Sequence, residues 1–210
     1  MNEWNNYHEH WNKATSLEGA KYLVGSNSAS LRNAEREYMK NVGLQPQHKF
    51  LDLGCGCLRG TIDLVNYLDD GNFYGLDVSE TLINFAGEYI KQEGFENKKQ
   101  NLKVNSDFDF EKYFPKIKYD FVLAASVLTH IYSEDTEKCL KNIAKVLNDG
   151  GSFYATIFVL PEEKNNIHEG NIHISYYKLS WLKKTAESVG LKFEDIGKTI
   201  IGQHMVRFYK

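Results

Sequence analysis

The sequence is poor in cysteine, and the cysteines it has do not follow the pattern of a disulfide-bonded fold. There are three, Cys55, Cys57 and Cys139. An odd number without framework spacing argues against a secreted disulfide scaffold. The spacing Cys55-x-Cys57 is too tight for a zinc knuckle, and no second pair completes one. These side chains are expected to fill a crowded turn and the core.

Long apolar runs and an excess of one charge are also absent. No apolar stretch approaches the ~20 residues that span a bilayer, and the first residues, MNEWNN, are too polar for a signal peptide. A cytoplasmic location without a membrane partner is therefore expected. The net charge is −3 with both signs dispersed, so nucleic acid is not the expected partner.

One stretch, KFLDLGCGCLRG at residues 49–60, carries the most specific pattern in the chain. Strand-like residues end in Asp52, a turn with Gly54 and Gly56 follows, and helix character runs from about Gly60 to Leu68. A strand, a glycine turn and a helix start form the place where α/β folds bind nucleotide-like ligands. Glycine lets the backbone approach such a ligand closely.

This turn departs from the dinucleotide fingerprint G-x-G-x-x-G. Gly54 and Gly56 fit the first two positions, but Arg59 stands at the third and Gly60 is one residue late. An arginine would obstruct the close helix–strand packing that the third glycine allows. The string acid-x-Gly-Cys-Gly followed by a non-glycine instead resembles motif I of the class I S-adenosylmethionine-dependent methyltransferases.

Hydrophobic patterning predicts an α/β fold along the rest of the chain. Strands are expected at 48–53, 73–77, 102–106, 119–125, 152–159, 191–196 and 203–209. Helices are expected at 28–41, 60–68, after Ser79, and at 134–147 and 177–189. This alternation indicates a doubly wound, seven-stranded, mostly parallel sheet with helices on both faces and a C-terminal antiparallel hairpin strand. The resemblance implies the same fold.

The chain length suits one large domain, with or without an N-terminal extension. Residues 1–45, rich in aromatic side chains, are expected to form a helical extension or lid, and 46–210 the cofactor-binding domain. The polar stretch 161–175 is longer than a minimal connection and is expected to form a functional loop on the acceptor side. His8-x-His10 has no third ligand nearby, so a metal pair there is disfavoured.

The resemblance assigns cofactor contacts to the carboxyl ends of the strands, where open α/β sheets bind ligands. Asp52 would order the turn and face the amino group of the methionine moiety, and Asp77 would accept hydrogen bonds from the ribose hydroxyls. Asp107 and Phe108 would lie near the adenine. The full expected set for S-adenosylmethionine is Asp52, Gly54, Cys55, Gly56, Arg59, Asp77, Val78, Asp107, Phe108 and Ala125, with no metal.

Several of these residues also allow a purely structural interpretation. Asp52 could accept backbone N–H bonds within its own turn, and Asp77 could be an acid favoured by a helix dipole. Asp107-Phe108-Asp109 also spells the D-x-D signature of nucleotide-sugar glycosyltransferases. Arg59 at a helix start opposes the dipole. It is either a solvated or packing arginine, or it pairs with an anion, which would be the cofactor carboxylate or a substrate phosphate or carboxylate.

Methyl transfer from a sulfonium is an in-line displacement, so alignment is the main task of such an enzyme. A hydroxyl acceptor also needs a base with a pKa near working pH, which favours histidine. The candidates are His130, His168 and His173. The expected acceptor is a small molecule, a hydroxyl of a sugar or related metabolite, or a carboxyl or amine. The absence of an Asn/Asp-Pro-Pro-Tyr sequence disfavours base and amide nitrogens.

Three other functions compete with this interpretation. A nicotinamide-dependent oxidoreductase is disfavoured by Arg59, by the C-terminal hairpin and by the lack of a Tyr-x-x-x-Lys pair after the fourth strand. A non-catalytic module would bind the cofactor without an acceptor pocket. A nucleic-acid methyltransferase is disfavoured by the acidic balance.

Overall fold

The computed structural model describes residues 9–25, 29–162, 174–198 and 202–210. The chain divides into two compact units, Met1–Ser106 and Asp107–Lys210. His168, His173 and most of the predicted acceptor loop lie outside the described residues.

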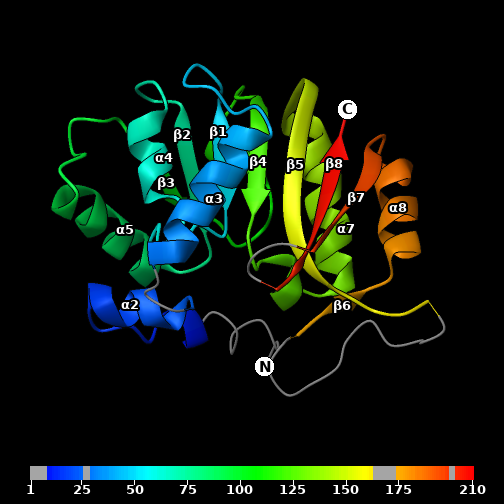
Figure 1. The fold of residues 1–210 in the computed structure, drawn as a ribbon, viewed down its shortest axis with the longest axis horizontal. Helices are drawn as coiled ribbons and strands as arrows, with labels where there is room; N and C mark the ends of the chain where they lie inside the picture. The colour runs from blue at the N-terminus through cyan, green and yellow to red at the C-terminus, as the bar shows by residue number, and fades with distance from the viewer. Residues whose placement is uncertain (1–8, 26–28, 163–173, 199–201) are drawn as a thin grey trace. The chain divides into compact units, whose positions relative to one another are not determined.

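The first unit is built on three parallel strands in the order β3-β2-β1 (Figure 1). They are β1 (Phe50–Leu53), β2 (Phe73–Asp77) and β3 (Asn101–Val104). Every residue of β1 and β2 is buried, as expected for parallel strands covered on both faces. The register sets Asp52 opposite Gly75, so the two strands end side by side.

Four helices belong to this unit. They are α2 (Leu17–Leu23), α3 (Ala29–Asn41), α4 (Ile62–Tyr67) and α5 (Glu80–Gln92). Figure 1 shows α3 in front of the strands, and its hydrogen bonds to α4 and α5 place these three helices beside one another. Ser16 caps α2 and Ser79 caps α5. Each hydroxyl accepts the backbone N–H of the residue three positions further along the chain. The helix after the glycine turn is shorter than predicted, because Gly60 and Thr61 still belong to the turn.

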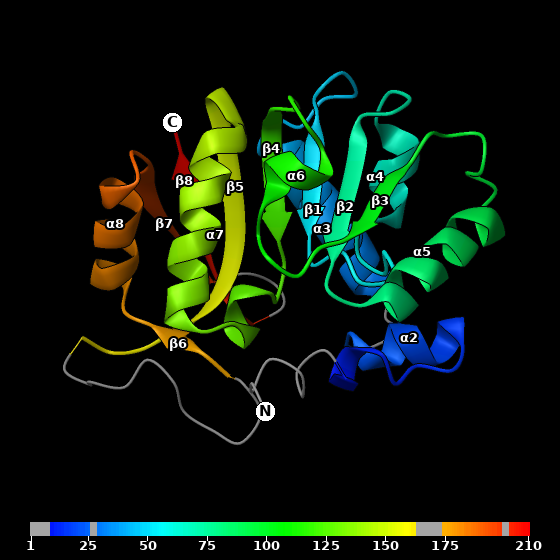
Figure 2. The same cartoon turned by 180° about the vertical axis from the view of Figure 1, so that it is seen from behind.

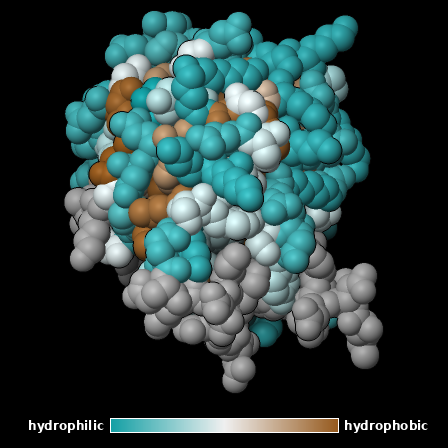
Figure 3. Space-filling model, turned by 90° about the vertical axis from the view of Figure 1, so that its right-hand side faces the viewer, coloured by the Kyte–Doolittle hydropathy of each residue, from teal (hydrophilic) through white to brown (hydrophobic). Residues whose placement is uncertain are grey.

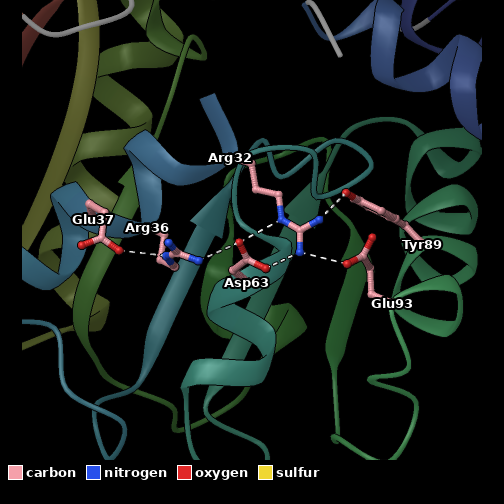
Figure 4. Close-up of polar contacts among 6 residues, drawn as sticks. All are labelled: Arg32, Arg36, Glu37, Asp63, Tyr89 and Glu93. Atoms are coloured by element: carbon pink, nitrogen blue, oxygen red, sulfur yellow. Dashed lines mark hydrogen bonds and ion pairs between the residues drawn. The ribbon is translucent and has the colours of Figure 1, made fainter. Parts of the chain in front are cut away.

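A polar network fastens α3 to the neighbouring helices α4 and α5 (Figure 4). Arg32 Nε donates to Asp63 Oδ2 at 2.8 Å, Nη2 to Glu93 Oε2 at 2.9 Å and Nη1 to the Tyr89 hydroxyl at 3.1 Å. Arg36 Nη1, one turn further along α3, also donates to Asp63 Oδ2, at 3.1 Å. These bonds fix the rotation of α3 about its own axis and its position along α4 and α5.

The second unit has the strand order β4-β5-β8-β7. Its strands are β4 (Tyr119–Ala124), β5 (Leu147–Val159), β7 (Lys192–Lys198) and β8 (His204–Tyr209), with the two-residue β6 (Tyr176–Tyr177) beside the end of β5. β4 and β5 are parallel, whereas β8 runs antiparallel to both β5 and β7. The predicted C-terminal hairpin is therefore confirmed.

The helical elements of this unit are short except for α7. They are α6 (Phe110–Tyr113), η1 (Leu128–His130), α7 (Ser133–Val146) and α8 (Leu179–Ser188). Figure 2 shows α7 over β5. The side of the molecule that carries α8 and β7 is mainly hydrophilic, with hydrophobic groups scattered among the polar ones (Figure 3).

The predicted class, a mostly parallel α/β sheet with a C-terminal antiparallel pair, is confirmed. The prediction missed α2, α6 and β6, and it placed the start of the fifth strand at Ser152 instead of Leu147. None of the helices in the described ranges is both long enough and apolar enough for a membrane crossing.

The network on α3 predicts a measurable contribution to stability. Asp63→Asn removes the charge that pairs with both Arg32 and Arg36, whose guanidinium groups are half-buried. We expect the free energy of unfolding, measured by urea denaturation, to fall by about 1–3 kcal/mol. The control is Glu37→Gln, which breaks an exposed ion pair with Arg36 and should cost less than about 1 kcal/mol. Equal losses of unfolding free energy in the two variants would contradict a stabilising role for the network around Asp63.

Candidate functional site

The glycine turn after β1 is bonded to the end of β2. The N–H groups of Gly54 and Cys55 both donate to Leu76 O, at 2.7 and 3.0 Å. Gly54 and Gly56 have φ values of 72° and 52°, in the left-handed region that favours glycine. The turn therefore folds back over the tip of β2 with its backbone, not side chains, facing the neighbouring strand end.

Asp77 ends β2, and its carboxylate is held by the backbone. Oδ2 accepts the Gly56 N–H at 2.8 Å and Oδ1 accepts the Ser79 N–H at 2.9 Å. Burial raises the pKa of Asp77 to about 6, and the backbone donors oppose that shift. Each carboxylate oxygen has a second lone pair. The Val78 N–H also acts on this carboxylate, so Asp77 keeps acceptor capacity for a hydroxyl of a ribose. Val78, half-buried, follows it directly.

Asp52 links β1 to the start of α4. Its Oδ2 accepts the hydroxyl of Thr61, the N-cap residue of α4. Burial raises the pKa of Asp52 to about 8; the Thr61 bond lowers it, while the charges of Glu35 and Asp77 raise it further. Three carboxyl groups thus lie close enough to influence one another. Asp52 orders the turn, and only its remaining acceptor capacity is available to a ligand.

The two cysteines of the turn are core side chains. Cys55 Sγ lies against Gly75 of β2, where an added Cβ would be 3.0 Å from the sulfur. Cys57 is fully buried and packs with Ala20 and Leu82. Burial raises the thiol pKa of both, so neither is a reactive thiolate. Cys55 can meet a ligand only through its backbone.

Arg59 lies in the turn before α4, not inside the helix. Nη2 donates to Val24 O at 3.0 Å, at the end of α2. Nε and Nη1 are buried and have no hydrogen-bond partner among the described residues. Arg59 lies just before the N-terminus of α4, where a cation is expected to oppose the helix dipole. Its contacts with Val24 and Gly25 are compatible with a packing arginine, and its pairing with an anion stays a prediction.

Glu35 of α3 is a site residue that the sequence did not reveal. Its carboxylate lies so close to Gly60 that a Cβ there would be 1.9 Å from Oε2. Burial raises the pKa of Glu35 to about 7, and the charge of Arg59 opposes this shift. No motif marks position 35, because α3 reaches the turn only through tertiary packing.

The N-terminal segment packs on the same turn. Val24 Cγ1 would be 3.2 Å from a Cβ on Gly56, and the Ser79 hydroxyl lies 3.0 Å from Trp11 O and 2.8 Å from Asn12 Oδ1. The segment from Trp11 to Gly25 therefore packs against both the turn and the start of α5. The predicted lid role of residues 1–45 stays a prediction.

In the second unit, Asp107 is engaged with its own loop. Burial disfavours the charged form of Asp107 and so acts to raise its pKa. The hydrogen bonds from Lys112 and from the Asp109 N–H outweigh this effect, so the pKa of Asp107 is lowered. Lys112 Nζ lies 2.8 Å from Oδ2, and the Asp109 N–H donates to Oδ1 at 3.0 Å. Asp109 caps α6. Phe108 is buried, with a φ of 56°.

Ala125 and His130 follow β4. The segment that contains His130 is hydrogen-bonded to Ser175, at the C-terminal end of the stretch 161–175. The Ser175 N–H donates to Thr129 O at 2.9 Å, and Ser175 Oγ donates to Ile131 O at 2.6 Å. Ala125 and His130 are both half-buried. The returning loop thus meets the short helix η1 that ends at His130.

No group of three or more His, Cys, Asp or Glu side chains in the described ranges is placed to hold a metal ion. His8, one half of the disfavoured metal pair, lies outside the described residues.

Comparison with known proteins identifies the family. Residues 51–153 match the family model described as a methyltransferase domain. The chain belongs to the class I S-adenosylmethionine-dependent methyltransferases. The matched region spans β1, the glycine turn and the strands up to β5. The dinucleotide interpretation is thereby set aside.

Individual relatives and structures agree with this membership. The chain is 33% identical over 114 residues to sterol 24-C-methyltransferase ERG6B of Gibberella zeae, covering 54% of this chain and 28% of that protein. It is 26% identical over 185 residues to demethylmenaquinone methyltransferase of Bacillus cytotoxicus, covering 77% and 74%. Magnesium protoporphyrin IX methyltransferase of Synechocystis, solved with bound S-adenosylhomocysteine, has the same fold, with a TM-score of 0.71, 14% identity and coverage of 98% and 99%.

The chain spans well under two thirds of several of these relatives, 28% of the sterol enzyme and 42% of the Methanocaldococcus jannaschii protein MJ0906. S-adenosylmethionine is the cofactor of the family, and the first unit fits it on three observations. The turn has glycines with positive φ where the backbone must approach a ligand closely, Asp77 keeps free acceptor capacity, and Nε and Nη1 of Arg59 are buried donors without partners among the described residues.

The buried carboxyls predict a pH-dependent stability. Because the pKa of Asp52 rises to about 8, the folded chain keeps a proton that the unfolded chain loses above about pH 4. The cofactor-free protein should therefore lose stability as pH rises from about 4, the unfolded pKa, to about 8, the folded pKa. Asp52→Asn cannot titrate and should flatten this fall in Tm, measured by scanning fluorimetry. Exposed Asp69→Asn should keep the wild-type slope, and a wild-type slope in Asp52→Asn would contradict the assignment.

Proposed function

We propose that the protein transfers the methyl group of S-adenosylmethionine to a small molecule, and that the acceptor atom is a hydroxyl of a sugar or related metabolite. The observation that carries the cofactor part is the contact of Gly56 N–H with the Asp77 carboxylate at the adjoining strand tips. It places a carboxylate that can accept from a ribose hydroxyl directly beside the glycine turn.

In this proposal each unit holds a different part of the reaction. Asp77 binds the ribose hydroxyls, and Gly54 and Gly56 let the backbone pass along the cofactor. Asp107, Phe108 and Ala125 of the second unit complete the proposed cofactor set. Asp107 would use the lone pairs left by Lys112 and Asp109, and the small side chain of Ala125 leaves room near the reacting methyl. The cofactor supplies an electrophilic methyl on a sulfonium, and the chain supplies alignment.

His130 is the proposed base for a hydroxyl acceptor. It lies at the end of η1, where Ser175 anchors the returning acceptor-side loop. A neutral imidazole there would take the hydroxyl proton as the oxygen attacks the methyl. His168 and His173 remain alternative candidates, and 161–175 remains the proposed acceptor-side loop.

A cofactor-binding experiment tests the first part. Isothermal titration with S-adenosylhomocysteine should give a saturable heat, whereas a nicotinamide dinucleotide should give none. Asp77→Asn replaces one acceptor oxygen with a donor that faces the N–H of Gly56 or Ser79, so the affinity should fall at least ~10-fold. Asp69→Asn, an exposed acid before β2, should leave it unchanged. Binding of the dinucleotide alone would overturn the assignment.

A turnover experiment tests the acceptor and the base. S-adenosylhomocysteine release should be screened against sugars, nucleotide sugars and small phenols, with a quinol and a sterol representing the acceptors that the relatives' names indicate. With an active hydroxyl acceptor, His130→Asn should lower kcat ~100-fold with little change in KM. His204→Asn, which alters a histidine paired with Asp195 on the hairpin, is the control. Turnover with only a carbon acceptor would refute the hydroxyl proposal.

A further inference from the structure

A groove runs between α7 and α8 on the surface of the second unit. The two helices contact one another, and Figure 2 shows them side by side. The groove has a volume of about 610 Å³. Its lining does not include Asp107, Phe108, Ala125 or His130, so it is separate from the residues assigned to methyl transfer. The charged and aromatic side chains that line it are Glu134, Glu137, Lys138 and Lys141 of α7 and Trp181 and Lys184 of α8.

The outward face of α7 carries its charges in a definite order. Positions 134, 137, 138 and 141 follow the spacing of one helical face, opposite the face that α7 buries in the core. All four side chains are exposed. The two acids, Glu134 and Glu137, come first, and the two lysines, Lys138 and Lys141, follow them. Pairs of Glu and Lys four residues apart also stabilise a solvated helix, but this effect does not account for the groove beside them.

The mixture of charges in the lining argues against a small ion as the occupant. An anion would meet the ammonium groups of Lys138, Lys141 and Lys184, but also two carboxylates that repel it. A cation would meet the reverse arrangement. The groove therefore suits a partner that carries both signs of charge in a matching order.

A second copy of this chain carries charges in that order. In a two-fold dimer the same surface meets itself, so two copies of a helix that crosses the axis run in opposite directions. With the axis midway between positions 137 and 138, Glu137 faces the partner's Lys138 and Glu134 faces the partner's Lys141. Only this axis position pairs all four charges, because pairing 134 with 138 and 137 with 141 would need two different centres, at positions 136 and 139.

Trp181 supplies an apolar anchor in the same groove. It is half-buried, and its ring stacks on that of Tyr177 with the centroids 5.8 Å apart. Tyr177 is fully buried, and its hydroxyl donates to Leu128 O at 2.8 Å. The indole therefore rests on a rigid support, and tryptophan is enriched among the residues that dominate binding at interfaces. Exposed ion pairs contribute little individually, so the charges set the register while Trp181 contributes affinity.

We propose that α7 and the groove beside it form the contact surface of a two-fold homodimer. In this dimer the α7 helices of the two copies lie antiparallel, and each is seated in the groove between α7 and α8 of the other copy. Packed helices have their axes about 8–10 Å apart, a distance that long glutamate and lysine side chains can span. The inference does not depend on the acceptor or on cofactor binding.

Sedimentation velocity of the full chain tests the dimer. At low salt and millimolar protein the wild type should sediment as a dimer. Raising the salt concentration from about 0.05 to about 1 M shortens the Debye length to about 3 Å, so the dimer should weaken at least ~10-fold. A monomer under the low-salt condition, or a dimer that salt does not weaken, would overturn the proposal.

Paired charge reversals test the register. Lys138→Glu with Lys141→Glu gives a face of four acids, and Glu134→Lys with Glu137→Lys gives a face of four lysines. Each double variant alone should be monomeric, because like charges then oppose one another across the axis. An equimolar mixture should form a heterodimer, because every pair is again of opposite sign. Dimers of either variant alone, or a mixture of folded variants that stays monomeric, would refute the antiparallel pairing of α7.

Single variants on α8 separate the groove from a general effect of charge. Trp181→Ala should weaken the dimer at least ~10-fold and leave its salt dependence in place. Lys183→Glu is the control, because it reverses an exposed charge on α8 that does not line the groove, and it should dimerise like wild type. Thermal unfolding of each variant reports whether the fold is intact. Equal weakening by Lys183→Glu and Trp181→Ala would count against the groove as the contact surface.

Discussion

A buried carboxylate at the tip of β2 sets the geometry of the first unit. Removing a charged group from water is costly unless hydrogen bonds replace the lost solvation. Asp77 obtains those bonds from the N–H groups of Gly56 and Ser79, so the glycine turn and the start of α5 must converge on it. The bonds from Gly54 and Cys55 to Leu76 O hold the turn in that position. The surface on which a nucleoside would lie follows from these few backbone contacts.

The local part of this arrangement could be predicted from the sequence. The strand ending in Asp52, the turn with Gly54 and Gly56 and the acid Asp77 are read from neighbouring residues, and the hairpin of β7 and β8 follows from alternation. The helix was expected to start at about Gly60, whereas α4 starts at Ile62 and leaves the arginine in the turn. Helix boundaries depend on which backbone groups the turn already uses.

What the sequence did not reveal depends on contacts between distant segments. Glu35 lies in an ordinary amphipathic helix, and nothing in its neighbourhood distinguishes it from Glu37, which points to solvent and pairs with Arg36. α2 was missed because its stability comes from packing against Cys57 and Leu82, far along the chain. The pairing of Asp107 with Lys112 likewise became visible only in three dimensions. Propensity is a weak guide where tertiary packing decides.

The close approach of Glu35 to Gly60 has an evolutionary consequence. A Cβ at position 60 would collide with the carboxylate, so an alanine there is compatible only with a shorter side chain at 35 or with a displaced α3. Homologous sequences should therefore vary at these two positions in concert, with glycine at 60 wherever a long acid stands at 35. A homologue without the long acid at position 35 no longer requires glycine at position 60.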